Sequence, residues 1–248
     1  MPSFSANLGF LWTDRPLTQA ITAAHTAGFS AVEAHWPYDT PAADVLAVLR
    51  ATGLPLLGIN TRKGDAPGDF GLCALPDRHD EAAAAVDEAM TYAAAVGARA
   101  VHVMAGKSSG PEAEAAFRTM LARALDQAQG RTVLIEPLNP FDAPGYFLRD
   151  TAHALDLIAD MAAPNLKLMF DCYHVARTEG DVLSRLEACW PAIGHIQFAS
   201  VPDRQEPDCG TLEYGPIFDA IDAAGWDTPL GAEYRPRTTT EDGLAWMR

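Results

Sequence analysis

Four oxygen-bearing side chains stand at or near the ends of four successive apolar stretches of the sequence. Glu136 ends the apolar run of "TVLIEPLN", Asp171 lies in "LMFDCYH", Gln197 in "HIQFAS" and Glu233 in "GAEYRP". A carboxylate that ends an apolar run is costly to bury unless it has a partner. Neighbouring members are separated by about one helix and two turns, so each could come from a different strand.

Three carboxylates in one place repel one another unless a cation lies between them. Carboxylate and amide oxygens suit a hard divalent ion such as Mg²⁺ or Mn²⁺ better than Zn²⁺. The four predicted metal ligands are therefore Glu136, Asp171, Gln197 and Glu233. Four protein oxygens in an octahedral shell leave two positions for adjacent oxygens of a small hydroxy-carbonyl compound. The two glutamates could then also move a proton, so Glu136 and Glu233 are the predicted catalytic residues.

The elements that must position these residues are eight β-type runs, which alternate with Ala-rich helical stretches. Such alternation is typical of a parallel sheet with crossover helices. Eight units within 248 residues predict one closed (β/α)8 barrel domain over 1–248. A doubly wound open sheet is the alternative, and it is disfavoured because no GxGxxG follows the first strand. The expected strands are 5–12, 31–36, 55–61, 99–106, 132–138, 166–173, 193–200 and 230–235. The expected helices are 16–28, 41–53, 79–97, 111–129, 151–162, 180–189, 214–225 and a short one closing the chain.

The alternation of side chains along a strand supports the grouping of the four residues. Glu136 shares a face with Leu134, and Asp171 shares a face with Met169. Gln197 has the same inward parity on the seventh strand. All four polar side chains are therefore expected to face the barrel axis at its C-terminal end, where active sites of such barrels lie.

Four further residues are candidates for binding a substrate. His174 lies just past Asp171 and could bind or protonate a substrate oxygen. Arg204 is expected on an exposed loop after the seventh strand, where it would grip a substrate carboxylate or else brace the loop through an ion pair. His102 and Lys107, on and after the fourth strand, are weaker candidates.

Composition excludes several classes of function. The net charge of −15 opposes binding of nucleic acid and of anionic membranes. No apolar run is long enough for a membrane helix, and the N-terminus lacks the pattern of a signal peptide, so a cytoplasmic location is expected. The spacing of the four cysteines fits no zinc site, and we expect them to be reduced. The expected partner is a small molecule, and homo-oligomerisation is left open.

At these residues the chain resembles the hydroxypyruvate isomerase family, within the xylose isomerase-like barrels. The resemblance spans nearly the whole chain and is densest in "IEPLNPFDAPGYFL", "FDCYH", "GHIQFASVPDRQEPD" and "AEYRP". It implies a (β/α)8 barrel, a divalent metal, and interconversion of hydroxypyruvate with tartronate semialdehyde. The family's two catalytic glutamates fall on Glu136 and Glu233, and its metal positions on these two together with Asp171 and Gln197.

Three departures from the family pattern lie around the predicted mouth. The segment 60–71 lacks a Trp after its "GD" pair, Ala176 stands where Gln is common, and Thr211 replaces an acid. Because they lie around the mouth, they leave the substrate more open than the metal ligands, and a sister activity on a longer 2-oxo acid, such as a 2-oxotetronate, is the alternative. Ketose 3-epimerases are similar but usually have His at the position of Gln197. The alternatives of other classes are a metal-dependent dehydratase, an endonuclease-type barrel and a barrel that binds a ligand without catalysis.

Overall fold

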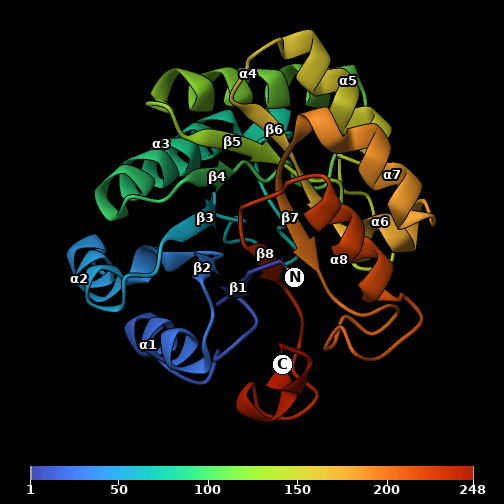
Figure 1. The fold of residues 1–248 in the computed structure, drawn as a ribbon. Coiled ribbons are helices and arrows are strands. Elements are labelled where there is room, and N and C mark those ends of the chain that lie inside the picture. The colour runs from blue at the N-terminus through green and yellow to red at the C-terminus, as the bar shows by residue number, and fades with distance from the viewer. Residues whose placement is uncertain (1, 248) are drawn as a thin grey trace.

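A computed structural model describes residues 2–247 of the protein. Eight parallel strands pair in chain order, and β1 also pairs with β8, so the sheet closes into a barrel (Figure 1). This confirms the predicted (β/α)8 fold. The strands are β1 (Phe4–Asn7), β2 (Ala31–Ala34), β3 (Leu56–Asn60), β4 (Ala100–His102), β5 (Thr132–Ile135), β6 (Leu166–Asp171), β7 (Ile193–Phe198) and β8 (Leu230–Ala232).

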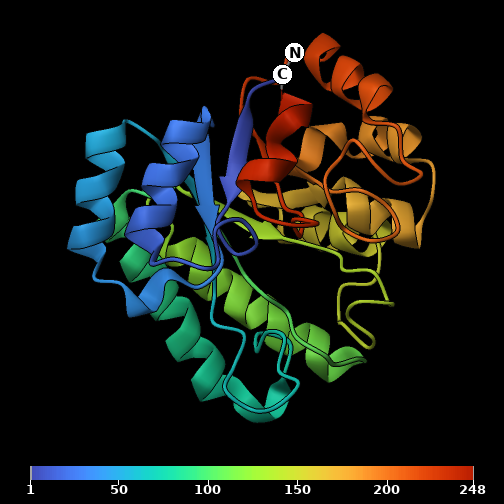
Figure 2. The ribbon, with the colours of Figure 1, turned by 90° about the horizontal axis from the view of Figure 1, so that it is seen from below.

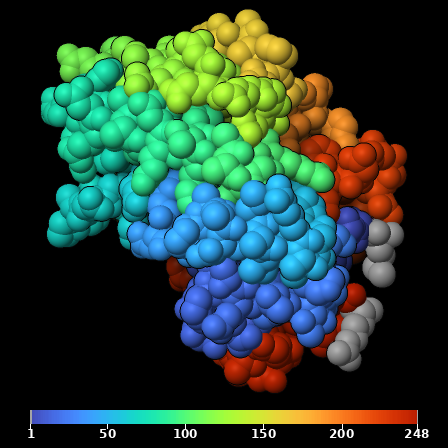
Figure 3. Space-filling model, turned by 90° about the vertical axis from the view of Figure 1, so that its left-hand side faces the viewer, coloured from blue at the N-terminus to red at the C-terminus, as the bar shows by residue number. Residues whose placement is uncertain are grey.

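Helices surround the barrel on its outside (Figures 1 and 2). On one flank the first helices of the chain lie side by side, and the C-terminal segment lies next to α1 (Leu17–Ala27) (Figure 3). The α-helices are α1 (Leu17–Ala27), α2 (Ala42–Thr52), α3 (His79–Val96), α4 (Pro111–Gln127), α5 (Thr151–Met161), α6 (Cys172–Thr178), α7 (Val182–Cys189) and α8 (Tyr214–Ala223). The 3₁₀ helices are η1 (Pro37–Asp39), η2 (Pro76–Arg78), η3 (Trp190–Ala192) and η4 (Glu241–Met247).

The ends of the seven expected α-helices lie within about two residues of the expected positions. Gly28, Gly53 and Gly97 are the C-caps of α1, α2 and α3, and all three have a left-handed backbone. Glycine adopts this conformation without the steric cost that a Cβ brings. The predicted eighth helix is the 3₁₀ segment η4.

One predicted boundary was wrong in a way that matters for the site. The sixth strand was expected to continue to residue 173, but helix α6 begins at Cys172. The Asp171 side chain accepts a hydrogen bond from the Tyr173 backbone N–H at 2.8 Å, which caps this helix. An Asp at this position therefore ends the strand and starts the helix at the same point.

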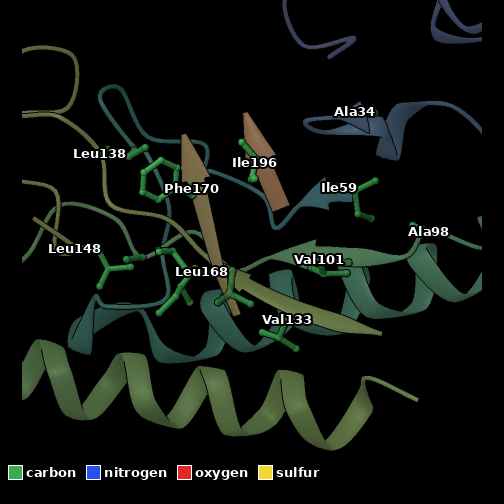
Figure 4. Packing of buried hydrophobic residues seen from close by; sticks show 14 of the residues in the cluster. Ala34, Ile59, Ala98, Val101, Val133, Leu138, Leu148, Leu168, Phe170 and Ile196 are labelled. Atoms are coloured by element: carbon green, nitrogen blue, oxygen red, sulfur yellow. The ribbon is translucent and has the colours of Figure 1, made fainter. Parts of the chain in front are cut away.

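The core has two parts, separated by the sheet. Outward-facing strand residues such as Val101, Val133 and Leu168 pack between the strands and the surrounding helices (Figure 4). Leu134 and Met169 belong instead to a small separate cluster of buried residues with Ala100. The two layers confirm the predicted side-chain alternation on β5 and β6.

Two further predictions from the sequence concern the cysteines and membrane-spanning helices. All four cysteines are free thiols. Between residues 2 and 247, no helix is both long and apolar enough to cross a membrane. The cytoplasmic location itself stays a prediction.

Candidate active site

Three carboxylates and one histidine converge at the C-terminal end of the barrel. Glu136 follows β5, Asp171 ends β6 and Glu233 follows β8, while His174 lies in the first turn of α6. Each of these residues offers one ligand atom, and the four atoms all lie within 4.8 Å of one another. The residues are only 5, 2, 6 and 3 % exposed for Glu136, Asp171, Glu233 and His174, respectively. The sequence prediction that the three acids share one place is thus matched by the geometry.

Several buried oxygens of this cluster lack a hydrogen-bond donor. Glu136 Oε1, Asp171 Oδ2 and Gln197 Oε1 accept no hydrogen bond from residues 2–247. The other oxygen of Asp171 is occupied, because it caps α6. Gln197 is the ladder partner of Asp171 on the neighbouring strand, which brings the two residues to the same level of the barrel. Buried acceptors without donors are rare in folded proteins and are satisfied by a cation, a ligand or an ordered water molecule.

This oxygen set fits a hard divalent cation. Three buried carboxylates and an amide oxygen are the ligand types that Mg²⁺ and Mn²⁺ take, and the unpartnered oxygens are the ones such a cation would satisfy. The four free cysteines contribute no thiolate to the group. The residues that could hold the ion are Glu136, Asp171, Gln197 and Glu233.

The two glutamates occupy electrostatically different environments. Burial raises the pKa of Glu136 well above its usual value, and the charges of Glu233 and Asp171 add to the effect. Burial also opposes ionisation of Glu233, but the Arg204 guanidinium and the hydrogen bond and charge of His35 together outweigh it, so the pKa of Glu233 falls well below its usual value. The pKa of Asp171 is raised to about 7, again mainly by burial. A cation between these groups would favour the ionised form of each.

Glu233 is held by donors from three other parts of the chain. Its Oε1 accepts a hydrogen bond from Asn7 Nδ2 at 3.1 Å and lies 2.8 Å from His35 Nε2. Its Oε2 accepts a hydrogen bond from Arg204 Nη2. The orientation of this carboxylate is therefore defined by β1, by the end of β2 and by the loop after β7.

His174 presents an N–H group to the cluster. Its Nδ1 accepts a hydrogen bond from the backbone N–H of Asn139 at 3.0 Å, and it lies 2.8 Å from Asn139 Nδ2. The backbone N–H can only donate, so Nδ1 carries no proton and Nε2 does. Burial lowers the pKa of His174 to about 3, which keeps the ring neutral near pH 7. His174 Nε2 is 3.6 Å from Asp171 Oδ2, so it can donate to a nearby oxygen but has no lone pair for a metal.

Arg204 was expected on an exposed loop, and this expectation was wrong. Its side chain is only 10 % exposed, because the guanidinium pairs with Glu233 and lies 3.6 Å from Asp171 Oδ2. The guanidinium carbon is also 4.8 Å from the ring centroid of Phe10 and 5.0 Å from that of Tyr173. The arginine is thus part of the site rather than of the solvated rim, and the alternative of a purely loop-bracing ion pair does not describe it.

The two weaker candidates occupy different places. His102 is buried beside Glu136, with Nδ1 at 3.6 Å from Oε2, and burial lowers its pKa to about 4. Lys107 is exposed and lines a surface cavity with Arg149 and Tyr146.

Three residues around the acids were missed by the sequence reading, which looked only at the later strands. Asn7 and His35 hold Glu233, and Glu33 accepts a hydrogen bond from Gln197 Nε2 at 2.8 Å. A usable signal existed in "AVEAHW", where Glu33 and His35 are two residues apart and so share the inward face of one strand.

Comparisons with known proteins agree with this arrangement. A family model described as xylose isomerase-like TIM barrel matches residues 21–248. The 2-oxo-tetronate isomerase of Cupriavidus necator is 41% identical over an alignment that covers 100% of this chain and 98% of that protein. The hydroxypyruvate isomerase of Escherichia coli is 35% identical, also over 100% of this chain and 98% of that protein.

A solved structure from Brucella melitensis, described as an AP endonuclease of family 2, is similar over the whole chain. It is 37% identical, its TM-score is 0.95, and the match covers 100% of this chain and 98% of that one. Its arrangement of elements is therefore nearly the same as here.

Proposed function

The chain belongs to the xylose isomerase-like TIM barrel family and is an isomerase of small hydroxy and oxo acids; we propose that it works with a divalent cation and two glutamates. The observation that carries the proposal is the meeting of Glu136 and Glu233, from β5 and β8, in one buried cluster with Asp171. The oxygens of Glu136 and Asp171 that lack a hydrogen-bond donor are suited to a cation, and the carboxylates of the two glutamates are suited to proton transfer.

The reaction exchanges a carbonyl and a hydroxyl group on neighbouring carbons through an enediolate. When bound, the cation would polarise the two substrate oxygens and offset the negative charge that develops on them. One glutamate removes the proton from the hydroxyl-bearing carbon next to the carbonyl, and the other delivers a proton to the former carbonyl carbon. The hydroxyl proton passes to the former carbonyl oxygen, so the step balances. Each positioned transfer contributes on the order of 10²–10⁴ in rate.

Two further side chains would bind the substrate. The Nε2–H group of His174 would donate a hydrogen bond to a substrate oxygen, because Asn139 occupies the other ring nitrogen. The buried guanidinium of Arg204 would pair with the substrate carboxylate, and the rings of Phe10 and Tyr173 restrict its movement. Arginine suits this role because its planar donors match a carboxylate.

Hydroxypyruvate and 2-oxotetronate are the two substrates that the family membership suggests. The resemblance in the motifs favours hydroxypyruvate, whereas the relative with 41% identity is a 2-oxo-tetronate isomerase. Departures from the hydroxypyruvate isomerase pattern at Ala176 and Thr211 also support the longer acid. Both acids carry a carboxylate, a carbonyl and an adjacent hydroxyl carbon, so one mechanism serves both.

The assay that tests the proposal compares the two acids directly. Metal-loaded protein is incubated with each acid in D₂O, and NMR follows both the product and the exchange of the carbon-bound proton with solvent. We expect turnover of at least one acid, with deuterium at the reacting carbons. Absence of product and of exchange with both acids would contradict the proposed function, and kcat/KM ranks the two substrates if both react.

Arg204→Ala is expected to lower kcat/KM for a carboxylate substrate by 2–4 kcal/mol, about 30- to 1000-fold, because a charge-assisted contact is lost. The expected signature is selectivity: because Arg204 also holds Glu233, kcat/KM for an analogue without the carboxylate, such as dihydroxyacetone, should fall as well, but by much less. Arg237→Ala is the matched control, since this arginine pairs with Glu206 in the same loop from outside the site. An equal fall in kcat/KM for both compounds would assign the arginine to holding Glu233 alone.

The alternatives are less well supported. An endonuclease would have to bring a phosphate backbone to a protein of net charge −15. A ligand-binding barrel without catalysis would not need two glutamates in one cluster. A dehydratase would use the same enolate chemistry, and loss of water in the NMR assay distinguishes it from isomerisation. An epimerase would return the substrate with inverted configuration and no shift of the carbonyl.

A further inference from the structure

We propose that Glu33 is a positioning residue that turns the Gln197 side chain so that its oxygen, not its nitrogen, faces the metal site. The inference rests on the proposed cation site and adds a requirement to it. It concerns strand β2, which none of the predicted metal ligands comes from.

The geometry defines which end of the amide faces which way. Gln197 Nε2 donates to Glu33 Oε2 at 2.8 Å, and both residues are buried, at 2 and 5 % exposure. An ionised carboxylate has only acceptors, so it selects the NH₂ end of the amide. The other end, Oε1, has no hydrogen-bond partner among the described residues. Its lone pairs are therefore available.

A glutamine needs such a partner more than a carboxylate does. The two ends of its amide have nearly the same shape, and a flip would point N–H groups at the cation. Asp171 is paired with Gln197 on the neighbouring strand, and its Oδ2 is likewise buried without a hydrogen-bond partner among the described residues. By accepting a hydrogen bond from the NH₂ group, Glu33 leaves the Gln197 amide oxygen facing the metal site, as a carboxylate oxygen would. Partners that orient metal ligands in this way are typically worth 10- to 100-fold in metal affinity.

Glu33 is itself held inside the barrel. Its Oε1 lies 3.1 Å from His195 Nε2, a residue that shares the inward face of β7 with Gln197. Gly231 on β8 leaves the room for the pair: a Cβ there would lie 2.3 Å from Glu33 Oε1 and 2.7 Å from Gln197 Cγ. Residues of β2, β7 and β8 thus together determine the direction of the Gln197 amide.

The test measures Mn²⁺ affinity by calorimetry on metal-free protein and its variants. Glu33→Gln can donate as well as accept, so it no longer selects one end of Gln197. We expect its Kd for Mn²⁺ to rise by about 10-fold or more. Glu179→Gln is the matched control, because Glu179 is also largely buried and accepts hydrogen bonds from Thr151 but lies outside the barrel. Its Kd should equal that of the wild type.

The exchanged pair Glu33→Gln/Gln197→Glu provides the second measurement. It keeps the charge and reverses the hydrogen bond, with the residue-33 amide donating to the residue-197 carboxylate. We expect it to bind Mn²⁺ within about threefold of the wild type and more tightly than Glu33→Gln or Gln197→Glu alone. A wild-type Kd in Glu33→Gln, or a folded exchanged pair that binds no better than the single variants, would overturn the inference. If the wild type itself binds no Mn²⁺, the proposed cation site fails instead.

Discussion

Replacing Glu136 or Glu233 by glutamine is expected to lower kcat by about 100-fold or more. Glutamine keeps the size and one oxygen of glutamate, so the barrel should fold, but it accepts no proton near pH 7. The enediolate mechanism requires a group that removes a proton from one carbon and a group that delivers a proton to the other, and glutamine does neither. The measurement is kcat for hydroxypyruvate and 2-oxotetronate, with thermal unfolding as the check on the fold.

The two glutamate variants should differ in a second readout. Deuterium exchange into the substrate reports the first proton removal alone, so one variant should lose it more than the other. The double variant should be little worse than the worse single one, because the residues act in one sequence of transfers. Mn²⁺ affinity is measured alongside, since each change also removes a charged ligand. Wild-type kcat in a variant that binds Mn²⁺ normally would leave that glutamate as a ligand only.

Removing the metal with EDTA is expected to abolish turnover, and Mg²⁺ or Mn²⁺ should restore it. Binding should also depend on pH, because burial raises the pKa of Glu136 and brings that of Asp171 to about 7. These acids hold protons at the lower pH, and the protons must leave before a cation can bind. Mn²⁺ affinity should therefore rise on the order of tenfold or more between pH 6 and pH 8.

The control for this effect is a variant that lacks one of the two titrating acids. Asp171→Asn should bind Mn²⁺ more weakly and with a shallower pH dependence, because one proton fewer is displaced. Full activity in protein shown to be free of metal would contradict the proposed role of the cation. Mn²⁺ affinity that is flat from pH 6 to pH 8 would contradict the raised pKa values as the state of the metal-free site.

Much of the site could be predicted from the sequence because its determinants are local. The alternation of side chains along a strand, together with the eightfold repeat, placed Glu136 and Asp171 on the inner face of neighbouring strands. Leu134 and Met169 confirm that parity by lying together inside the barrel. The boundary at Asp171 was missed because its side chain prefers to cap a helix rather than to extend the strand.

What surrounds each acid depends on closure of the barrel. Asn7 and Glu233 are 226 positions apart in the sequence, yet they form a hydrogen bond because β1 pairs with β8. Glu33 on β2 and Gln197 on β7 are 164 positions apart and meet inside the closed barrel, although β8 and β1 lie between their strands. No periodicity along the chain predicts such contacts.

The sequence by itself therefore determined the barrel, the inward residues and the oxygen chemistry of the site. Only the tertiary structure decided which of the two glutamates accepts hydrogen bonds from other side chains and which does not. Glu233 receives Asn7, His35 and the buried Arg204, whereas Glu136 Oε1 receives none among residues 2–247. The physical reason is that burial and charge pairing depend on distances in space, and in a closed barrel the first strands and the last are neighbours.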